Sequence, residues 1–209
     1  MKQIPSPSRK RLTSLVQILS QKISEKKEKI TSSEISEITS WSESSIRRDI
    51  SLLELHSGKS NGYSVAELKK SIEEKLNLTI SNQTEIKKCC IVGLGKVGSV
   101  FLDESMFSGT KFKIVAGFDA NQNRIEILKS DFPLYSTSNM ESIIRAEKIQ
   151  FALLCVSDEN APKYADRLAE CGIKGIVNYT KTFVAAKPGV KIENASPISL
   201  LESLASIEL

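Results

Sequence analysis

Apolar side chains recur every three or four residues through most of the first eighty positions, which is the period of an amphipathic helix. The pattern predicts helices over residues 8–24, 31–39, 43–53 and 65–78. Thr31 stands three residues before a glutamate, the spacing of a capping box, so the second helix is expected to begin there. Two short helices joined by a tight turn predict a helix-turn-helix.

The helix expected over 43–53 has an apolar inner stripe and a polar outer face, as a DNA recognition helix does. Arginine binds guanine edges bidentately and hydroxyls bind phosphates. The alternative is that the arginines pair with acids of their own helix, Glu43, Asp49 or Glu54. A turn-rich tip over 56–62 predicts the wing, with a lysine for the minor groove. The predicted DNA contacts are Ser44, Ser45, Arg47, Arg48 and Lys59.

From residue 86 onward the pattern changes to short apolar strands that alternate with helical segments, which predicts a parallel sheet in an α/β domain. The run at 149–156 is almost wholly apolar, as expected of a strand buried on both faces. The expected strands are 89–92, 114–118, 133–135, 149–156, 175–178 and 190–193, and the expected helices lie near 100–102, 124–130, 141–146, 160–171 and 197–209.

A G-x-G-x-x-G turn follows the first of these strands, and the second strand ends in an acid, Asp119. This arrangement is typical of a Rossmann dinucleotide site. We expect a helix to leave the turn and to direct its positive dipole end at the phosphates, while Asp119 accepts from a ribose and disfavours a 2′-phosphate. The alternative is a Rossmann scaffold with an empty crevice. The predicted nucleotide-binding residues are Gly93, Leu94, Gly95, Lys96, Val97, Gly98 and Asp119.

Charge and cysteine content narrow the set of partners and ligands that we expect for the protein. Residues 1–80 hold 14 Lys/Arg against 10 Asp/Glu, whereas residues 81–209 hold 15 of each, so the whole excess of +4 lies in the half with the helix-turn-helix pattern. This favours a nucleic-acid partner. The four cysteines form no C-x-x-C pair, so we expect buried thiols and no metal. No apolar run approaches the length of a membrane span, so we expect a cytoplasmic protein.

With both halves in view, the chain resembles the Rex family of bacterial redox-sensing repressors, and the resemblance extends over nearly its whole length. The likeness lies in the order of several short motifs. The segments that carry it are Arg11-Leu12, Ser32-Ser33-Glu34-Ile35, Ile46-Arg47-Arg48-Asp49-Ile50-Ser51, Gly58-Lys59-Ser60-Asn61-Gly62-Tyr63, Ile91–Gly98, Gly117-Phe118-Asp119 and Gly172–Tyr179.

The resemblance implies a homodimer that binds double-stranded operator DNA through paired winged helices. It also implies that NADH releases the DNA, that NAD⁺ favours the bound form, and that a C-terminal helix is exchanged between subunits. The expected organisation is a winged-helix domain over 1–80, a linker over 81–85, a Rossmann NAD(H)-binding domain over 86–195 and a dimerisation helix over 196–209.

The chain departs from the family at the nicotinamide end and at the connection between domains. The family places an Asp before the exchanged helix, where it couples to an arginine of the DNA-binding domain. Here Ser196 and Pro197 occupy those positions, although Arg11 is retained. Glu104 replaces a tyrosine and Ser157 a proline. An acid facing the nicotinamide would favour its cationic, oxidised form, unless Glu104 pairs with Lys181 or faces solvent. One alternative is therefore a regulator with weakened NADH discrimination.

Two further functions compete with the redox-responsive repressor. An NAD-dependent oxidoreductase would need catalytic residues, and the sequence has neither a Tyr-x-x-x-Lys pair nor a histidine placed after a strand. We therefore expect no enzymatic activity. A winged-helix regulator that ignores nucleotides, with a Rossmann half that only dimerises, is the other alternative. It is opposed by the glycine turn and favoured by the departures at the nicotinamide end.

Overall fold

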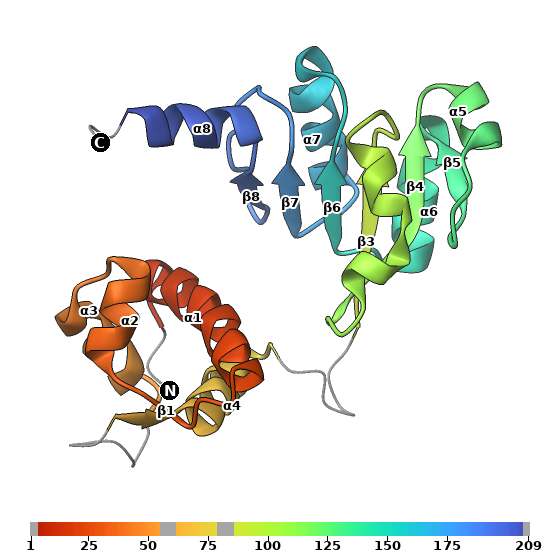
Figure 1. The fold of residues 1–209 in the computed structure, drawn as a ribbon. Helices are drawn as coiled ribbons and strands as arrows, with labels where there is room; N and C mark the ends of the chain where they lie inside the picture. The colour runs from red at the N-terminus through yellow and green to blue at the C-terminus, as the bar shows by residue number, and fades with distance from the viewer. Residues whose placement is uncertain (1–3, 55–61, 79–85, 207–209) are drawn as a thin grey trace. The chain divides into compact units, whose positions relative to one another are not determined.

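The computed structural model describes residues 4–54, 62–78 and 86–206, and the chain divides into two compact units, Met1–Thr84 and Glu85–Leu209 (Figure 1). The expected linker over 81–85 and the wing residue Lys59 lie outside the described residues.

The first unit is built on the helices that the apolar pattern predicts. Their inner stripes meet in one core that includes Leu12, Leu19, Ile35, Ile46 and Ile72, all nearly inaccessible to solvent. Burial of these side chains provides the main driving force for folding of the unit. Its elements are α1 (Ser6–Ser24), β1 (Lys29–Ile30), α2 (Ser32–Thr39), α3 (Glu43–Ser51), β2 (Tyr63–Ser64) and α4 (Val65–Leu76).

The helix-turn-helix is fixed by local hydrogen bonds at both helix starts. The predicted capping box at Thr31 is confirmed, because its hydroxyl accepts from the Glu34 N–H and the Glu34 carboxylate accepts from the Thr31 N–H. Ser40 ends α2 in the left-handed conformation, at φ 58°. Ser42 caps α3 by accepting from the Ser45 N–H. β2 pairs antiparallel with β1, so its described partner is the strand after α1.

The second unit contains a six-stranded parallel sheet in the order β5-β4-β3-β6-β7-β8 (Figure 1). The chain adds strands to one side of β3 and then returns to add strands to the other side. Nucleotides bind at such a switch point in open α/β sheets. The strands are β3 (Lys87–Val92), β4 (Phe112–Asp119), β5 (Leu134–Ser136), β6 (Phe151–Leu154), β7 (Gly175–Asn178) and β8 (Lys191–Asn194).

Both faces of this sheet are covered, as the continuous apolar runs predict. Cys90 and Val92 of β3 face the layer formed by α6 (Met140–Glu147) and α7 (Ala161–Glu170). Cys89 and Ile91 point to the opposite layer, because successive strand residues face opposite sides. That second layer contains η1 (Gly98–Leu102), η2 (Glu104–Phe107) and the loop that follows α5 (Gln122–Ile127). Two further 3₁₀ turns, η3 (Thr137–Asn139) and η4 (Asp158–Asn160), precede α6 and α7.

The prediction of a helix that leaves the glycine turn is wrong about the kind of helix. The chain forms two short 3₁₀ segments there, η1 and η2, and Asp103 separates them in an extended conformation. The Asp103 carboxylate accepts from the Ser105 N–H, a local bond that competes with helix continuation. So short a 3₁₀ segment has no macrodipole comparable with that of an α-helix. Any phosphate bound at this turn is therefore held by the loop N–H groups and not by a helix dipole.

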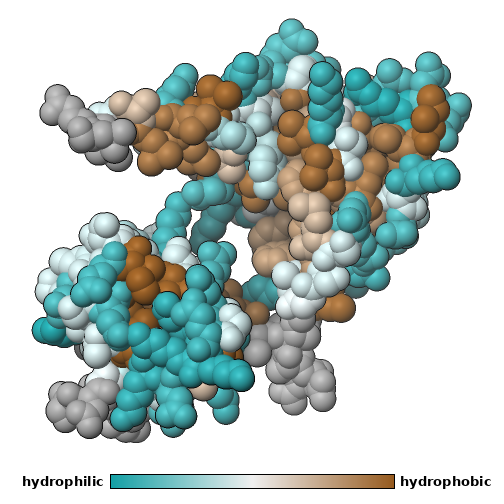
Figure 2. Space-filling view, in the orientation of Figure 1, coloured by the Kyte–Doolittle hydropathy of each residue, from teal (hydrophilic) through white to brown (hydrophobic). Residues whose placement is uncertain are grey.

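The terminal helix α8 (Pro197–Ala205) buries none of its residues against the rest of the unit. Its large apolar side chains are between 45% and 62% exposed, and Figure 2 shows them as a continuous brown surface. An apolar face of this size needs a covering partner in water. The exposed side chains are Ile198, Leu200, Leu201 and Leu204.

An ion pair inside the first unit was not anticipated. Asp49 of α3 is buried and accepts from Arg11 of α1 at both carboxylate oxygens, from Nε at 2.6 Å and from Nη2 at 2.9 Å. The hydrogen bond that Arg11 donates to the Asp49 carboxylate raises the pKa of the guanidinium further. Arg11 therefore fixes the recognition helix to the first helix.

Replacing Asp49 with Ala should lower the free energy of unfolding by about 2 kcal/mol, because it removes the two charge-assisted hydrogen bonds that join α1 to α3. Urea unfolding followed by circular dichroism measures the change. The matched control is Glu141→Ala, which removes the exposed pair with Arg145 and should alter stability little. Equal effects of the two substitutions would contradict a structural role for the pair.

Candidate nucleotide site and recognition helix

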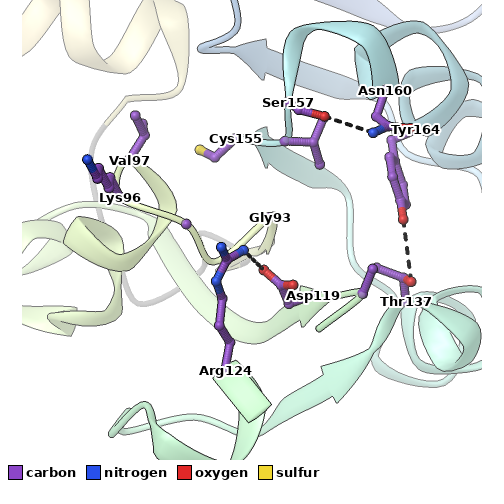
Figure 3. Close-up of a pocket in the computed structure, with 13 residues that line it drawn as sticks. Gly93, Lys96, Val97, Asp119, Arg124, Thr137, Cys155, Ser157, Asn160 and Tyr164 are labelled. Atoms are coloured by element: carbon purple, nitrogen blue, oxygen red, sulfur yellow. Dashed lines mark hydrogen bonds and ion pairs between the residues drawn. The ribbon is translucent and has the colours of Figure 1, made fainter. Parts of the chain in front are cut away.

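A pocket of about 480 Å³ lies at the carboxyl ends of β3, β4 and β6, at the switch point of the sheet (Figure 3). Gly93 follows β3, Asp119 ends β4 and Cys155 follows β6, so three parallel strands deliver their ends to one place. The opposite wall comes from Asn160, the last residue of η4, and from Tyr164 of α7, and Figure 3 shows the Tyr164 hydroxyl directed at Thr137. The volume is typical of small-molecule sites.

The three glycines of the turn have different physical roles. Gly93 has φ +92°, which other residues rarely adopt. A Cβ atom on Gly98 would lie 1.8 Å from the Gly93 carbonyl oxygen, so only glycine fits there. A Cβ atom on Gly95 would meet only the Arg124 Nη1 atom, at 3.9 Å, so this position opens on the pocket. The pocket therefore admits a ligand directly above the Gly95 backbone.

The turn also presents unused donors. In the described part of the chain, the N–H groups of Gly95, Lys96 and Val97 have no protein acceptor. Successive free N–H groups in a loop form an anion-binding concavity. Together with the exposed Lys96 side chain they suit a pyrophosphate.

Asp119 has a structural role that the sequence did not reveal. Its side chain is 6% exposed, and its carboxylate accepts from the Leu94 N–H and the Asn121 N–H, each at 2.7 Å. A third contact comes from Arg124 Nη1 at 3.4 Å. The carboxylate thus holds the glycine turn to the end of β4 and keeps limited capacity for a ribose hydroxyl.

The structure places most of the predicted nucleotide residues at the pocket wall, namely Gly93, Gly95, Lys96, Val97 and Asp119. Leu94 and Gly98 do not line it, because the Leu94 side chain packs into the core and Gly98 packs beneath the turn. Ser157, named from the sequence as a departure at the nicotinamide end, also lines the pocket. Sequence reasoning missed other lining residues that follow β4, β5 and β6, which no motif marks. The lining residues missed are Ala120, Arg124, Thr137, Cys155, Val156, Asn160 and Tyr164.

Glu104 does not face this pocket. It lies in η2, where its carboxylate is 3.7 Å from the Lys113 ammonium of β4. The expected alternative pairing with Lys181 is therefore wrong, and the Lys181 N–H instead donates to Asp158. Ser157 does line the pocket, where it accepts from Asn160 at 2.7 Å (Figure 3).

The two arginines of the recognition helix have different surroundings. Arg47 donates to Glu43 and, at 3.0 Å, to the Ser32 hydroxyl, so for this residue the alternative of pairing within the unit is confirmed. Arg48 is exposed, and among the described residues its side chain makes no hydrogen bond or ion pair. Ser44 and Ser45 share hydrogen bonds with the Ser42 hydroxyl at the helix start.

Comparison with known proteins decides the family. Residues 84–182 match the model of the CoA binding domain, and residues 3–51 match a model described as "Putative DNA-binding protein N-terminus". The chain is 30% identical over 201 residues to the redox-sensing transcriptional repressor Rex of Exiguobacterium sp., a match that covers 96% of this chain and 90% of that relative. The Rex of Lactobacillus gasseri is also 30% identical, over 96% of this chain and 92% of its own.

This chain belongs to the Rex family of redox-sensing transcriptional repressors. The resemblance drawn from its motifs is thereby confirmed. The crystal structure of RSP, a Rex-family repressor, superposes with a TM-score of 0.81 at 27% identity, over 98% of this chain and 94% of that one. RSP in complex with NAD⁺ and operator DNA gives 0.83 at 24% identity, over 98% and 92%. The winged-helix and Rossmann fold class is therefore also confirmed.

The structure shows what the residues at the connection between domains do in this member of the Rex family. Arg11, retained where the family was expected to couple its domains, is bound bidentately to Asp49 within the first unit. Ser196 is buried at the N-cap of α8, and Pro197 occupies its first turn. Each of these residues therefore has a local role within its own unit.

The described residues form neither a membrane-spanning helix nor a metal-binding cluster. None of their helices combines the length and the apolar character that crossing a bilayer requires. No three of their histidine, cysteine, aspartate or glutamate side chains gather as a metal centre would.

The thiols of Cys89 and Cys155, near the site, are unreactive at neutral pH. Burial raises the pKa of Cys155 in the pocket, and of Cys89 in the adjacent strand, to about 12 from an ordinary 9.0. Because only the thiolate is nucleophilic, both groups are inert near neutral pH. Cys171 is half-buried at the end of α7 and is the accessible thiol for comparison.

A maleimide reagent at pH 7 should therefore modify Cys171 in the native protein and leave Cys89 and Cys155 intact, as read by mass spectrometry. Since the folded pKa values lie above the unfolded ones, the neutral thiols stabilise the fold below pH 9. The free energy of unfolding should fall as pH rises from about 9 to about 12. Rapid native-state labelling of Cys155 at pH 7 would contradict this assignment.

Proposed function

We propose that this protein is a transcriptional repressor whose affinity for operator DNA depends on the ratio of NADH to NAD⁺. The observation that carries the proposal is the pocket at the switch point, where Gly95 is open and its neighbouring N–H groups lack protein acceptors in the described chain. The same chain carries a helix-turn-helix whose second helix exposes Arg48. A nucleotide sensor and a DNA reader are thus joined in one polypeptide.

The relatives support this function. They are named redox-sensing transcriptional repressors, and RSP has been crystallised with NADH and with NAD⁺ and operator DNA. The cofactor is accordingly NAD(H). With that group bound, Gly95, Lys96 and Val97 would hold the pyrophosphate, and Asp119 would take a hydroxyl of the adenine ribose.

Discrimination between the two redox states follows from charge. Oxidised nicotinamide is cationic and reduced nicotinamide is neutral, so a dry apolar wall favours NADH because burying an unpaired charge is costly. Cys155 and Val156 supply such a wall after β6. Glu104 would oppose the preference, but its carboxylate contacts Lys113 and it does not line this pocket. Weakened discrimination remains the second candidate, because Ser157 places a hydroxyl at this wall.

The remaining features fit a repressor that is not an enzyme. The functional form is a homodimer, with α8 as the apolar element that a second subunit covers and can exchange. A two-fold dimer reads two operator half-sites. The protein works beside the chromosome, in the cytoplasm. The DNA contacts are Arg48 in the major groove, Ser44 and Ser45 at phosphates, and Lys59 in the wing.

The first test measures operator binding across a range of NADH/NAD⁺ ratios. DNA retention should fall as NADH rises in the wild type. In Gly95→Ala the fold should persist, since the new Cβ meets only Arg124 at 3.9 Å. Its methyl group enters the pyrophosphate path, so NADH affinity should drop by about tenfold or more, roughly 1.4 kcal/mol. The NADH response should then shift to higher concentration.

Three other outcomes are informative. DNA binding that ignores NADH entirely in the wild type would overturn the redox assignment. Binding of NADH and NAD⁺ with equal affinity would support the candidate with weakened discrimination. Oxidation of NADH by added carbonyl compounds would revive an oxidoreductase.

The second test compares the two recognition-helix arginines. Arg48→Ala should cost about 1–3 kcal/mol of operator affinity and relax base preference, as loss of a bidentate guanine contact does. Arg47→Ala is the matched control, with a smaller effect expected because Glu43 and Ser32 hold that side chain. Fluorescence anisotropy with operator and scrambled duplexes measures both. A larger loss of specificity in Arg47→Ala would reverse the assignment.

A further inference from the structure

The adenine-ribose end of the pocket contains a cation beside its carboxylate. Arg124, in the helix after β4, lies with Nη1 3.4 Å from Asp119 Oδ2, and Figure 3 shows its guanidinium reaching the carboxylate beneath the glycine turn. A carboxylate at this position normally repels a phosphate on the adenine ribose. Here its charge has a compensating partner at close range.

The Asp119 carboxylate is largely occupied by the protein itself. The Leu94 and Asn121 N–H groups each donate to it at 2.7 Å, and its side chain is 6% exposed. Its described contacts hold the turn in place. Asp119 is therefore a positioning residue first, and it is a weaker barrier to a 2′-phosphate than an exposed, unpaired acid would be.

Arg124 keeps most of its donors available. The side chain is 51% exposed, and Asp119 receives only the Nη1 donor of a guanidinium that carries five N–H groups. Nη1 also lies 3.9 Å from the position of a Cβ on Gly95, so the guanidinium borders the path of the pyrophosphate and ribose. Arginine binds phosphate in a bidentate manner.

The charge of the whole pocket wall agrees with this geometry. Asp119 is the only acid among the described residues that line the pocket, whereas Lys96 and Arg124 both contribute a positive charge. The empty pocket wall therefore has a net positive charge, which suits an anionic nucleotide.

We propose that Arg124 receives the 2′-phosphate of an adenine ribose, so that this site binds NADPH as well as NADH. The inference rests on the proposed nucleotide-binding function and assigns the ligand class of that same site. It differs from the expectation drawn from the sequence, in which Asp119 alone selected NAD(H).

The experiment titrates the full-length protein with NADH and with NADPH, following nucleotide fluorescence or heat. The wild type should bind NADPH within about tenfold of NADH. Arg124→Ala should weaken NADPH at least about fivefold more than NADH. Arg145→Ala is the matched control, since it also removes an exposed, ion-paired arginine but lies outside the pocket. It should change neither affinity.

Loss of Arg124 also leaves the Asp119 charge uncompensated, which would by itself repel a phosphate. The comparison is therefore repeated in an Asp119→Asn background, where that charge is absent. Direct contact predicts that Arg124→Ala still weakens NADPH selectively. Equal losses for both nucleotides in that background overturn the proposal. Arg124→Gln provides a second variant that keeps most of the side-chain stem.

Failure of the inference and failure of the proposed function give different results. A wild-type protein that binds NADH but binds NADPH more than a hundredfold more weakly overturns the role of Arg124 and leaves the repressor function standing. A protein that binds neither nucleotide overturns the proposed function itself.

Discussion

The Asp119 carboxylate, by accepting from the Leu94 N–H, joins the turn after β3 to the end of β4. The geometry of the pocket depends on that bond. It fixes the Leu94 backbone while the Leu94 side chain packs into the core, and Gly93 and Gly98 allow the chain to close tightly around it. With these three residues committed to the turn, the Gly95 segment is left facing the pocket with open space above it. The site is thus a consequence of how the turn is held.

This arrangement places the sensing chemistry in the bound nucleotide. The thiols beside the pocket are buried and their pKa values are raised, so they are poor targets for oxidants at neutral pH. A nicotinamide ring, by contrast, changes its charge when it is reduced, and burying an unpaired charge in apolar surroundings is costly. The oxidised and reduced nucleotides therefore differ in charge, and a binding site can distinguish them by that difference.

Ion pairs in the first unit hold two of its arginines, Arg11 and Arg47. Arg11 is held by the buried Asp49, and Arg47 is held by Glu43 and Ser32. The first pair joins α3 to α1 inside the unit, whereas the second lies on the surface, where the Arg47 side chain is 62% exposed. Arg48 is left on the outer face, where it extends from a helix whose position the other two have fixed.

The sequence determined the fold class, the order of the strands along the chain and the identity of the turn glycines, because apolar periodicity and glycine geometry are local properties of the backbone. It located Asp119 at the pocket. It did not reveal that Asp119 is tied to Leu94 and Arg124, that Arg11 binds Asp49 across 38 positions, or that the expected helix after the turn is a broken 3₁₀ segment. Those features depend on which side chains the folded sheet and helices bring within hydrogen-bond distance. Only the tertiary structure decides that, since such contacts join residues that no periodic pattern relates.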